Sequence, residues 1–289
     1  MNRLDKELHT RGLAKSRTSA AELVSQKKVA VNGVICTLVS RKVNVEDIIE
    51  VVGELPRYVS RGGLKLEYAI EQFEIDLTGK VCLDVGASTG GFTDCMLQKG
   101  ASRVYAVDVG TAQLASVLSE DERVISIENC DIRTAELPEK VGFAAVDVSF
   151  ISAKLILPEL KRFIFSRANA VGANRNDLAP EQILKATDAY SRANAVGANR
   201  NDLAPEQILK ATDAYSRANA VILLLKPQFE LGKRHKGVVS DPRVQARVVS
   251  DMVAFAEEIG FEVGGIVESP ILGKSGNREF LIKLGVKPK

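Results

Sequence analysis

Three glycines follow a short apolar run, VCLDV, at residues 81–85 of the chain. Gly86, Gly90 and Gly91 then precede a helical pattern, FTDCMLQKG. Glycines lack a Cβ atom and let a ligand approach the backbone, and the first turn of a helix offers free N–H groups. This strand, loop and helix order is typical of a nucleotide-type site, and we expect Ser88 of the same loop to belong to it.

Acidic residues around this loop indicate which ligand it would bind. A dinucleotide fingerprint reads G-x-G-x-x-G, and the glycine spacing here differs from it. Asp84 would repel a pyrophosphate but could accept from the ammonium of a methionyl group, and Asp108, which ends the next strand pattern, could accept both hydroxyls of a ribose. Asp131, after a third strand pattern, could sit beside an adenine ring. These acids favour S-adenosylmethionine over NAD; a glycine turn with solvated acids is the alternative.

Two lysines and two carboxylates stand beside the ends of separate predicted elements. Lys65 is near the start of a helical pattern, Asp147 and Lys226 end apolar strand patterns, and Glu279 directly precedes the last one. Methyl transfer to a ribose 2′-hydroxyl needs a proton acceptor, because the pKa of that hydroxyl is far above neutrality. A lysine whose pKa is lowered by burial and a nearby ammonium can accept the proton, while the carboxylates orient the pair. The four residues form a coherent 2′-O-methyltransferase set.

Strand and helix patterns alternate from residue 81 onwards, which predicts a parallel sheet covered by helices. The fold class is therefore α/β, with a Rossmann-like sheet of the class I S-adenosylmethionine-dependent methyltransferase type and a small N-terminal α/β domain. Ligand and chemistry should gather at the carboxyl edge of such a sheet. We expect one helix through Leu114 and Leu118 and another over AKLILPELKRFIF. A third helix is expected over SRGGLKLEYAIEQF. Its apolar residues should face a core: Leu64, Leu66, Ala69, Ile70 and Phe73.

The first 52 residues predict a small module of two helices packed on a hairpin. Gly12 can end the first helix, Ser16 can cap the second, and Asn32 and Gly33 form a hairpin turn. Residues 1–42 carry nine basic and three acidic residues, an excess of six positive charges. Such an excess marks this end of the chain as the place to look for nucleic acid, although charged residues often form only a solvated surface.

The order R-L-D-x-x-L, S-R-x-x-A and V-x-V-N-G resembles the RNA-binding module named after ribosomal protein S-four, over nearly all of residues 1–52. Modules of that kind hold structured RNA by shape and phosphate contacts more than by base sequence. The resemblance implies RNA contacts at Arg3, Arg11, Lys15, Arg17 and Lys28.

Longer runs resemble the TlyA family, also called hemolysin A-like, which has an FtsJ-type methyltransferase domain. They are VSRGGLKL, CLDVGASTGGFTD, VDVG, VDVSFIS, LLKPQFE, GVVSDP and SGNREF. The resemblance implies 2′-O-methylation of cytidine in 16S and 23S ribosomal RNA with S-adenosylmethionine. It places the family's catalytic tetrad on Lys65, Asp147, Lys226 and Glu279.

The patterns divide the chain into an RNA-binding domain at 1–52, a linker at 53–59 and a methyltransferase domain at 60–289. A 25-residue unit at 166–190 recurs unchanged at 191–215 and begins a third time at Ser216, so the repeat interrupts the domain at 166–220. Two units are too few for a solenoid core. We interpret the repeat as a tandem duplication in a surface connection, with no chemical role.

Composition is ordinary for a soluble globular protein, and no apolar run approaches the 18 residues of a membrane span. Four cysteines without a C-x-x-C spacing predict reduced thiols in a cytoplasmic protein. No metal is expected, because His235 has no partner with ligand spacing. Two other hypotheses remain: a membrane-active hemolysin, for which neither a span nor a cationic amphipathic segment is evident, and a non-catalytic RNA-binding ribosome assembly factor.

Overall fold

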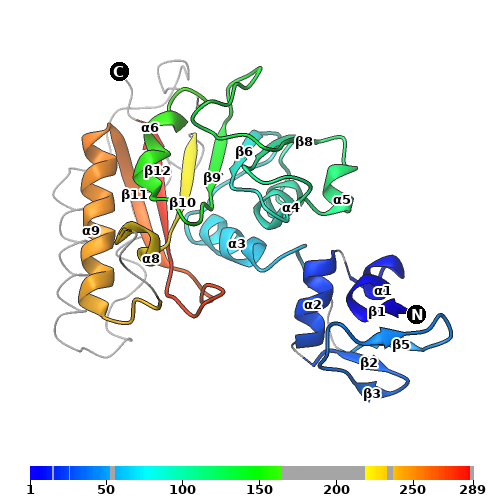
Figure 1. Ribbon diagram of the computed structural model, residues 1–289. Coiled ribbons are helices and arrows are strands. Elements are labelled where there is room, and N and C mark those ends of the chain that lie inside the picture. The colour runs from blue at the N-terminus through cyan, green and yellow to red at the C-terminus, as the bar shows by residue number, and fades with distance from the viewer. Residues whose placement is uncertain (15, 26, 53–55, 165–218, 233–236, 287–289) are drawn as a thin grey trace.

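The computed structural model describes residues 1–14, 16–25, 27–52, 56–164, 219–232 and 237–286. The largest of its β-sheets has seven strands (Figure 1). Neighbouring strands from β10 to β8 are parallel, whereas β12 is antiparallel to both of its neighbours. The α/β fold class predicted from the sequence is confirmed. In spatial order the strands are β11 (Phe261–Glu268), β12 (Phe280–Val286), β10 (Ala220–Leu225), β9 (Phe143–Val146), β6 (Val81–Val85), β7 (Arg103–Val107) and β8 (Val124–Ile127).

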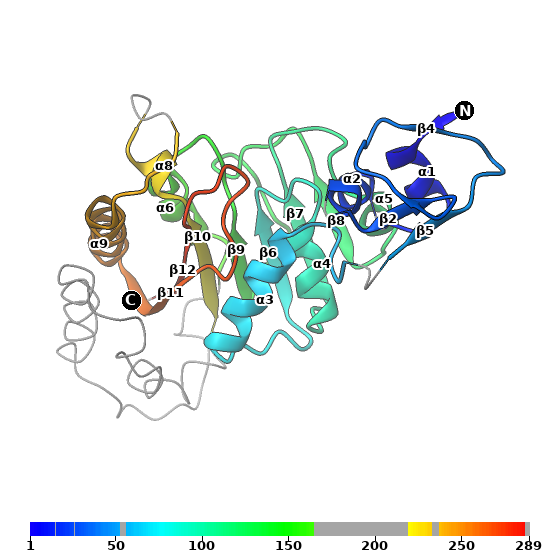
Figure 2. The same ribbon diagram turned by 90° about the horizontal axis from the view of Figure 1, so that it is seen from below.

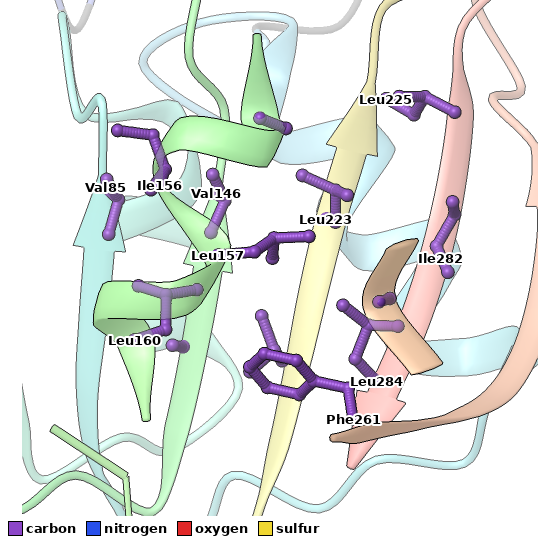
Figure 3. Close-up of a cluster of buried hydrophobic side chains, with 14 of the residues drawn as sticks. Val85, Val146, Ile156, Leu157, Leu160, Leu223, Leu225, Phe261, Ile282 and Leu284 are labelled. Atoms are coloured by element: carbon purple, nitrogen blue, oxygen red, sulfur yellow. The ribbon is translucent and has the colours of Figure 1, made fainter. Parts of the chain in front are cut away.

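Helices cover both faces of this sheet (Figure 2). One face carries α3 (Gly62–Gln72), α4 (Gly91–Gln98) and α5 (Ser116–Ser119). The other carries the 3₁₀ turn η1 (Ala153–Leu155), α6 (Leu157–Leu160), α8 (Pro227–Glu230) and α9 (Pro242–Glu258). Strand β10 is buried along its whole length because alternate residues face the two layers. Leu223 and Leu225 point to the layer of α6 and α9 (Figure 3), whereas Ile222 and Leu224 point to that of α3 and α4.

Three predicted helical features are wrong in detail. The helix expected through Leu114 and Leu118 is confined to Ser116–Ser119. The helix expected over AKLILPELKRFIF is broken into η1 and α6, with Pro158 in the first turn of α6, because proline has no N–H to continue the preceding hydrogen-bond ladder. Leu64 of α3 is 40% exposed instead of buried, and Lys65 takes a buried place on that helix.

The N-terminal module has the predicted two helices and hairpin. Ser16 Oγ accepts from the backbone N–H of Ser19 at the start of the second helix, as a cap does. Asn32 and Gly33 both have positive φ angles, as a tight two-residue hairpin turn requires. The elements are β1 (Asn2–Arg3), α1 (Leu4–Thr10), α2 (Arg17–Ser25), β2 (Val29–Val31), β3 (Val34–Ile35), β4 (Lys42–Val43) and β5 (Ile49–Val51).

The described part of the predicted linker is packed between the two parts of the chain. Tyr58 and Val59 are almost fully buried. Val59 accepts a hydrogen bond from Ser16 Oγ at 3.1 Å, and its own N–H donates to Asp94 Oδ2 of α4 at 2.8 Å. These contacts tie the N-terminal module to the methyltransferase sheet. The division at 52 and 59 stays a prediction.

The predicted repeat at 166–220 lies outside the described residues except for its last two. Ala220 is the first residue of β10 and pairs with Phe143 and Gly285. Deleting residues 171–220 would put Ala170 directly before Val221, so an alanine would still occupy the first position of the strand. Loop-closure entropy changes by only about 0.6 kcal/mol per doubling of loop length. We therefore expect the deletion variant to keep its melting temperature and its cofactor affinity; an insoluble variant would show that the repeat packs on the core.

Candidate active site

The strand register brings the candidate chemistry to one edge of the sheet. Val146 pairs with Val85 on one side and with Leu223 on the other, and Leu225 pairs with Phe280. Gly86, Asp147 and Lys226 therefore follow their strands at the same edge at which Glu279 enters β12. This is the carboxyl edge of the parallel strands, where ligands of open α/β sheets bind.

The four candidate catalytic residues form two close ion pairs. Lys65 Nζ lies 2.5 Å from Glu279 Oε2, and their side chains are 10% and 4% exposed. Lys226 Nζ lies 2.6 Å from Asp147 Oδ1, and these side chains are 11% and 23% exposed. Asp147 Oδ1 has no aligned hydrogen-bond donor among the described residues, so it contacts Lys226 as a charge. The sequence analysis expects a second ammonium beside the lysine that accepts the proton; the polar contacts of Lys226 among the described residues are with Asp147 and with Ser149 Oγ at 2.8 Å.

Local backbone structure determines where the side chains of Lys226 and Glu279 lie. Lys226 follows the buried strand β10 and precedes Pro227, which starts α8 and ends the strand. Opposite Glu279, a Cβ on Gly273 would lie 2.2 Å from Glu279 Oε1, so a residue with a side chain would displace the carboxylate. A glycine at 273 therefore leaves room for the Glu279 carboxylate in the position from which it pairs with Lys65.

Phe150 is a feature of this site that the sequence analysis missed. It is 92% exposed and adopts a positive φ of 67°, which is uncommon for an aromatic residue. Its ring lies 5.2 Å from the ring of Phe229, and Lys226 Nζ lies 5.8 Å from that second ring. The sequence VDVSFIS shows an aromatic residue three positions after Asp147, but it shows neither the exposure of that residue nor its conformation.

The glycine loop is held in shape by Asp108. Its two carboxylate oxygens accept from the backbone N–H groups of Ser88, at 2.8 Å, and Gly110, at 2.7 Å. Gly86 has a φ of 83°, and a Cβ there would lie 2.6 Å from the carbonyl oxygen of Asp147. Gly90 has a φ of 91° and caps α4, whose first residue is Gly91. The loop therefore needs glycine for its conformation and for its approach to β9.

Asp84 is fully buried beneath this loop. Its Oδ2 accepts from Thr93 Oγ1 at 2.6 Å, and its Oδ1 has no hydrogen-bond partner among the described residues. Burial raises the pKa of the Asp84 carboxyl to about 7, and the negative charge of Asp147 adds to that rise. A buried carboxylate oxygen without a partner is a place where a ligand cation or a water molecule can bind.

Asp131 is engaged in a local ion pair. Arg133 Nη2 lies 2.6 Å from Asp131 Oδ2, and Arg133 holds the pKa of this carboxyl below its usual range. Its predicted place beside an adenine ring stays a prediction. A shallow hollow opens beside Asp108 instead, lined by Ala87, Ser88, Ala106, Asp108, Gly110, Gln113, Leu114, Ser126 and Glu128.

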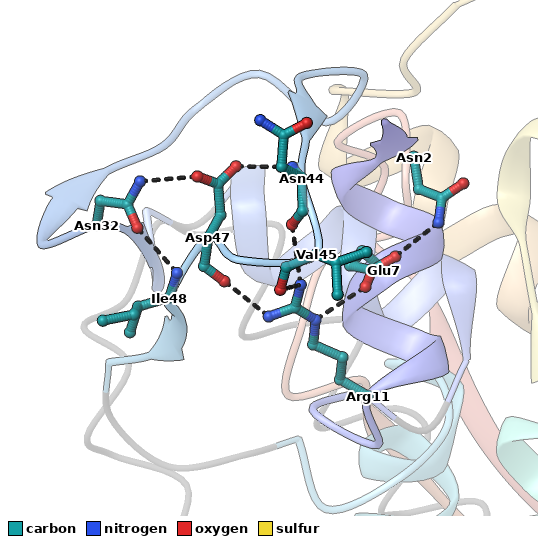
Figure 4. Close-up of polar contacts among 8 residues, drawn as sticks. All are labelled: Asn2, Glu7, Arg11, Asn32, Asn44, Val45, Asp47 and Ile48. Atoms are coloured by element: carbon teal, nitrogen blue, oxygen red, sulfur yellow. Dashed lines mark hydrogen bonds and ion pairs between the residues drawn. The ribbon is translucent and has the colours of Figure 1, made fainter.

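The residues predicted to contact RNA differ in how exposed they are and in the contacts that they already make within the module. Arg3 and Arg17 both contact the buried carboxylate of Asp5 and are 46% and 57% exposed. Lys28 is partly exposed, and Lys15 lies outside the described residues. Arg11 is 26% exposed and ties α1 to the turn before β5 (Figure 4). Its guanidinium donates to Glu7 and to the carbonyl oxygens of Asn44, Val45 and Asp47.

Within the described ranges there is no group of three or more His, Cys, Asp or Glu side chains that could hold a metal ion. The helices that the structure describes include none that is both long and apolar enough to cross a membrane.

Residues 58–286 match the family model for the FtsJ-like methyltransferases. The chain belongs to this family. Residues 2–49 of this FtsJ-like methyltransferase match a second model, that of the S4 domain. The predicted methyltransferase domain type and the predicted type of N-terminal module are thereby confirmed.

Curated relatives and solved structures agree with this placement. The chain is 36% identical over 290 residues to the 16S/23S rRNA (cytidine-2′-O)-methyltransferase TlyA of Mycobacterium tuberculosis, covering 98% of this chain and 89% of TlyA. It is 33% identical to Hemolysin A of Brachyspira hyodysenteriae, covering 96% and 98%. A solved structure from Streptococcus thermophilus that carries the hemolysin name has a TM-score of 0.65 and 34% identity, covering 99% and 90%. The resemblance to the TlyA family is confirmed.

Proposed function

We propose that this methyltransferase moves a methyl group from S-adenosylmethionine to the 2′-hydroxyl of a cytidine ribose in 16S ribosomal RNA, 23S ribosomal RNA or both. The observation that carries the proposal is the ion pair between Lys226 and Asp147, which lies at the carboxyl edge of the sheet and is partly open to solvent. The name of the TlyA relative supports the substrate, and the S4 domain supports an RNA partner.

The residues beneath and around the glycine loop fit the proposed cofactor. Asp84 Oδ1 is a buried acceptor without a partner among the described residues, as a carboxylate that receives the ammonium of a methionyl group would be. Asp108 lines a hollow at the end of β7, and its oxygens keep lone pairs for a ribose hydroxyl besides those used by Ser88 and Gly110. When bound, S-adenosylmethionine supplies an electrophilic methyl group on a sulfonium.

The pair of Lys226 and Asp147 gives the hydroxyl proton a path. A neutral Lys226 amine can accept this proton, and the carboxylate of Asp147, whose Oδ1 lies 2.6 Å from Lys226 Nζ, stabilises the ammonium that forms. The 2′-hydroxyl gives its proton to this lysine as the ribose oxygen bonds to the methyl carbon, and the bond from that carbon to sulfur breaks to leave a neutral thioether. The net result is one proton moved from the ribose oxygen to the pair. Ser149 Oγ, 2.8 Å from the same nitrogen, holds the lysine in place.

Phe150 gives the target nucleotide a surface beside this pair. Proteins that act on unpaired RNA stack exposed bases on aromatic side chains. Phe150 is 92% exposed, and its ring and that of Phe229 are tilted by 50° with their centroids 5.2 Å apart. We propose that a base stacks on Phe150 while its ribose faces Lys226.

The function is tested with ribosomal RNA from cells that lack the gene. The purified protein is incubated with isolated 16S and 23S ribosomal RNA, or intact subunits, and tritiated S-adenosylmethionine, and ribose methylation is mapped by primer extension. We expect label on a cytidine 2′-oxygen. Binding of the RNA without transfer would instead favour a non-catalytic assembly factor. Leakage from lipid vesicles without transfer would favour a membrane-active protein.

The raised pKa of Asp84 makes cofactor binding depend on pH. In the free protein the neutral carboxyl is favoured below a pH of about 7, whereas the proposed ammonium partner needs the charged form. We expect the affinity for S-adenosylmethionine to increase as the pH rises from about 5.5 to 7.5, through the Asp84 pKa of about 7. Calorimetry in two buffers of different ionisation enthalpy should detect proton release on binding. Asp84→Asn should bind more weakly and lose the pH dependence; an unchanged pH profile in that variant would argue against this ammonium site.

The exposed cations of the N-terminal module should contribute mainly through RNA phosphates. Arg17→Gln and Lys28→Gln leave the pair between Arg3 and Asp5 in place. Each lost phosphate contact should lower the slope of log affinity against log salt by about 0.7 to 0.9. Filter binding to ribosomal RNA at several salt concentrations measures this slope. Lys140→Gln, an exposed lysine before β9 at the opposite edge of the sheet, is the matched control and should leave the slope unchanged.

A further inference from the structure

Helix α3 lies along strand β12, and the two elements start at the same edge of the sheet. Along β12, Glu279, Leu281 and Lys283 occupy alternate positions and therefore share a face. Leu281 packs in the same buried cluster as Leu66, Ala69 and Ile70 of α3. The face of β12 that carries Glu279 is therefore the face that α3 covers.

Buried ammonium groups join these elements at both ends of the helix. At its first turn, Lys65 Nζ contacts Glu279 Oε2 at 2.5 Å. At its end, Lys283 Nζ donates to the carbonyl oxygen of Phe73, the residue that caps α3, at 3.3 Å. Helix carboxyl ends have free carbonyl groups and favour a nearby cation. Lys65 thus extends from the helix to the residue that precedes the strand, and Lys283 extends from the strand to the end of the helix.

The lengths of the two connected segments match. Four residues of strand from Glu279 to Lys283 span about 13 Å. Eight residues of helix from Lys65 to Phe73 span about 12 Å. The two contacts therefore form together at the observed axial position of α3 on β12, and the contact at Phe73 favours the position of the helix at which Lys65 reaches Glu279.

A glycine pair in β11 makes room for the contact at Phe73. The register between β11 and β12 shifts between Val263 and Gly265, which leaves Gly264 as the extra residue of a bulge. A Cβ on Gly264 would lie 3.3 Å from Lys283 Cδ, and one on Gly265 would lie 2.6 Å from the ring of Phe73. Larger residues there would displace the Lys283 stem or the end of α3.

We infer that Lys283 is a positioning residue for Lys65: its buried contact with the carbonyl of Phe73, made possible by the Gly264–Gly265 bulge, fixes the axial position of α3. The inference rests on the proposed function for its catalytic consequence. Lys283 is 4% exposed and lies at the far end of α3 from the site, so it does not touch the reacting groups and acts through the position of the helix on β12. Small displacements of a positioned group can lower a rate by up to about a hundredfold.

The test uses the full chain with Lys283→Met, which keeps most of the stem and removes the ammonium, and Lys283→Arg, which keeps a cationic donor. Lys283→Met should lower kcat for RNA methylation by about 10- to 100-fold, while KM for RNA and Kd for S-adenosylmethionine stay within about twofold. Lys65 should become several-fold more reactive towards an acylating reagent, as read by peptide mass spectrometry. Lys283→Arg should restore both properties.

The matched control is Lys80→Met. Lys80 is a second lysine whose Nζ is buried and, within the described residues, has no hydrogen-bond partner. Burial lowers the pKa of both lysines, and the charge of Lys80 lowers that of Lys283 further, so removal of Lys80 favours the charged form of Lys283 that donates to Phe73. Removal of Lys80 should leave kcat and Lys65 reactivity unchanged. Equal losses in Lys80→Met and Lys283→Met would overturn the inference, as would wild-type kcat and Lys65 reactivity in Lys283→Met.

Two further measurements distinguish failure of the inference from misfolding of the variant and from failure of the proposed function. If Lys283→Met is insoluble, Gly265→Ala should produce the same loss of kcat and the same gain in Lys65 reactivity by pressing on Phe73; wild-type values there would overturn the inference. If the wild-type protein methylates no ribosomal RNA, the proposed function fails, whereas Lys65 reactivity in Lys283→Met still decides whether Lys283 positions α3.

Discussion

Lys226→Ala should abolish methyl transfer while leaving the affinities for RNA and S-adenosylmethionine close to wild type. The substitution removes the nitrogen that contacts both Asp147 and Ser149, and with it the proposed proton path. Positioned general acid–base groups contribute about 10²- to 10⁴-fold to a rate, so single-turnover methylation of ribosomal RNA should fall by at least about a hundredfold. The side chain is only 11% exposed, but it lies at the end of its strand, so the core of β10 should remain intact.

Two further variants distinguish loss of the proton acceptor from a loss of folding. Lys226→Arg keeps the positive charge but cannot act as a neutral acceptor, and it should be nearly as inactive as the alanine variant. Lys140→Ala removes an exposed lysine before β9, at the start of the strand that Asp147 follows, and should retain full activity. Turnover of Lys226→Ala within a few-fold of wild type would show that Lys226 is not the proton acceptor.

The parallel strands of the sheet and the edge that carries the site could be predicted from sequence because the signals are local, whereas the strand order and the antiparallel β12 were not predicted. The run AVILLL before Lys226 is buried on both faces, as an interior strand of an α/β sheet must be. Glycines with positive φ mark the turn from β6 into α4. Once strands alternate with helices, the parallel arrangement brings the residues that follow Val85, Val146 and Leu225 together without further information.

Pairing and exposure of individual side chains could not be predicted, because they depend on contacts distant in the sequence. Lys65 and Glu279 are 214 residues apart and form the more buried ion pair. A lysine near a helix start usually faces solvent, yet on α3 Lys65 faces inwards to meet Glu279 and Leu64 is left exposed.

The arginines of the N-terminal module likewise make contacts that could not be predicted from the sequence. Counting positive charge treats Arg3, Arg11 and Arg17 alike, but Arg11 uses its guanidinium to hold the turn before β5. A residue with several backbone acceptors is already committed to the fold, and its substitution should lower stability more than it alters the salt dependence of RNA binding. The contribution of Arg11 to RNA binding stays a prediction.

Asp108→Ala should weaken binding of S-adenosylmethionine by about 10- to 150-fold, which corresponds to the loss of roughly 1.5 to 3 kcal/mol per charge-assisted hydrogen bond. Its carboxylate is expected to accept the cofactor ribose. It also accepts from the N–H groups of Ser88 and Gly110, so the alanine variant loses the group that shapes the glycine loop.

Asp108→Asn separates these two roles. The amide has the same shape but only one accepting oxygen, so one of the two backbone N–H groups would face another donor. Calorimetry should rank the affinities as wild type, then asparagine, then alanine, with RNA affinity and melting temperature little changed because Asp108 follows its strand and is not part of the core. Equal cofactor affinity in all three proteins would show that the ligand binds away from Asp108. An asparagine variant as weak as alanine would mean that the negative charge, more than the number of accepting oxygens, holds the loop and the ribose.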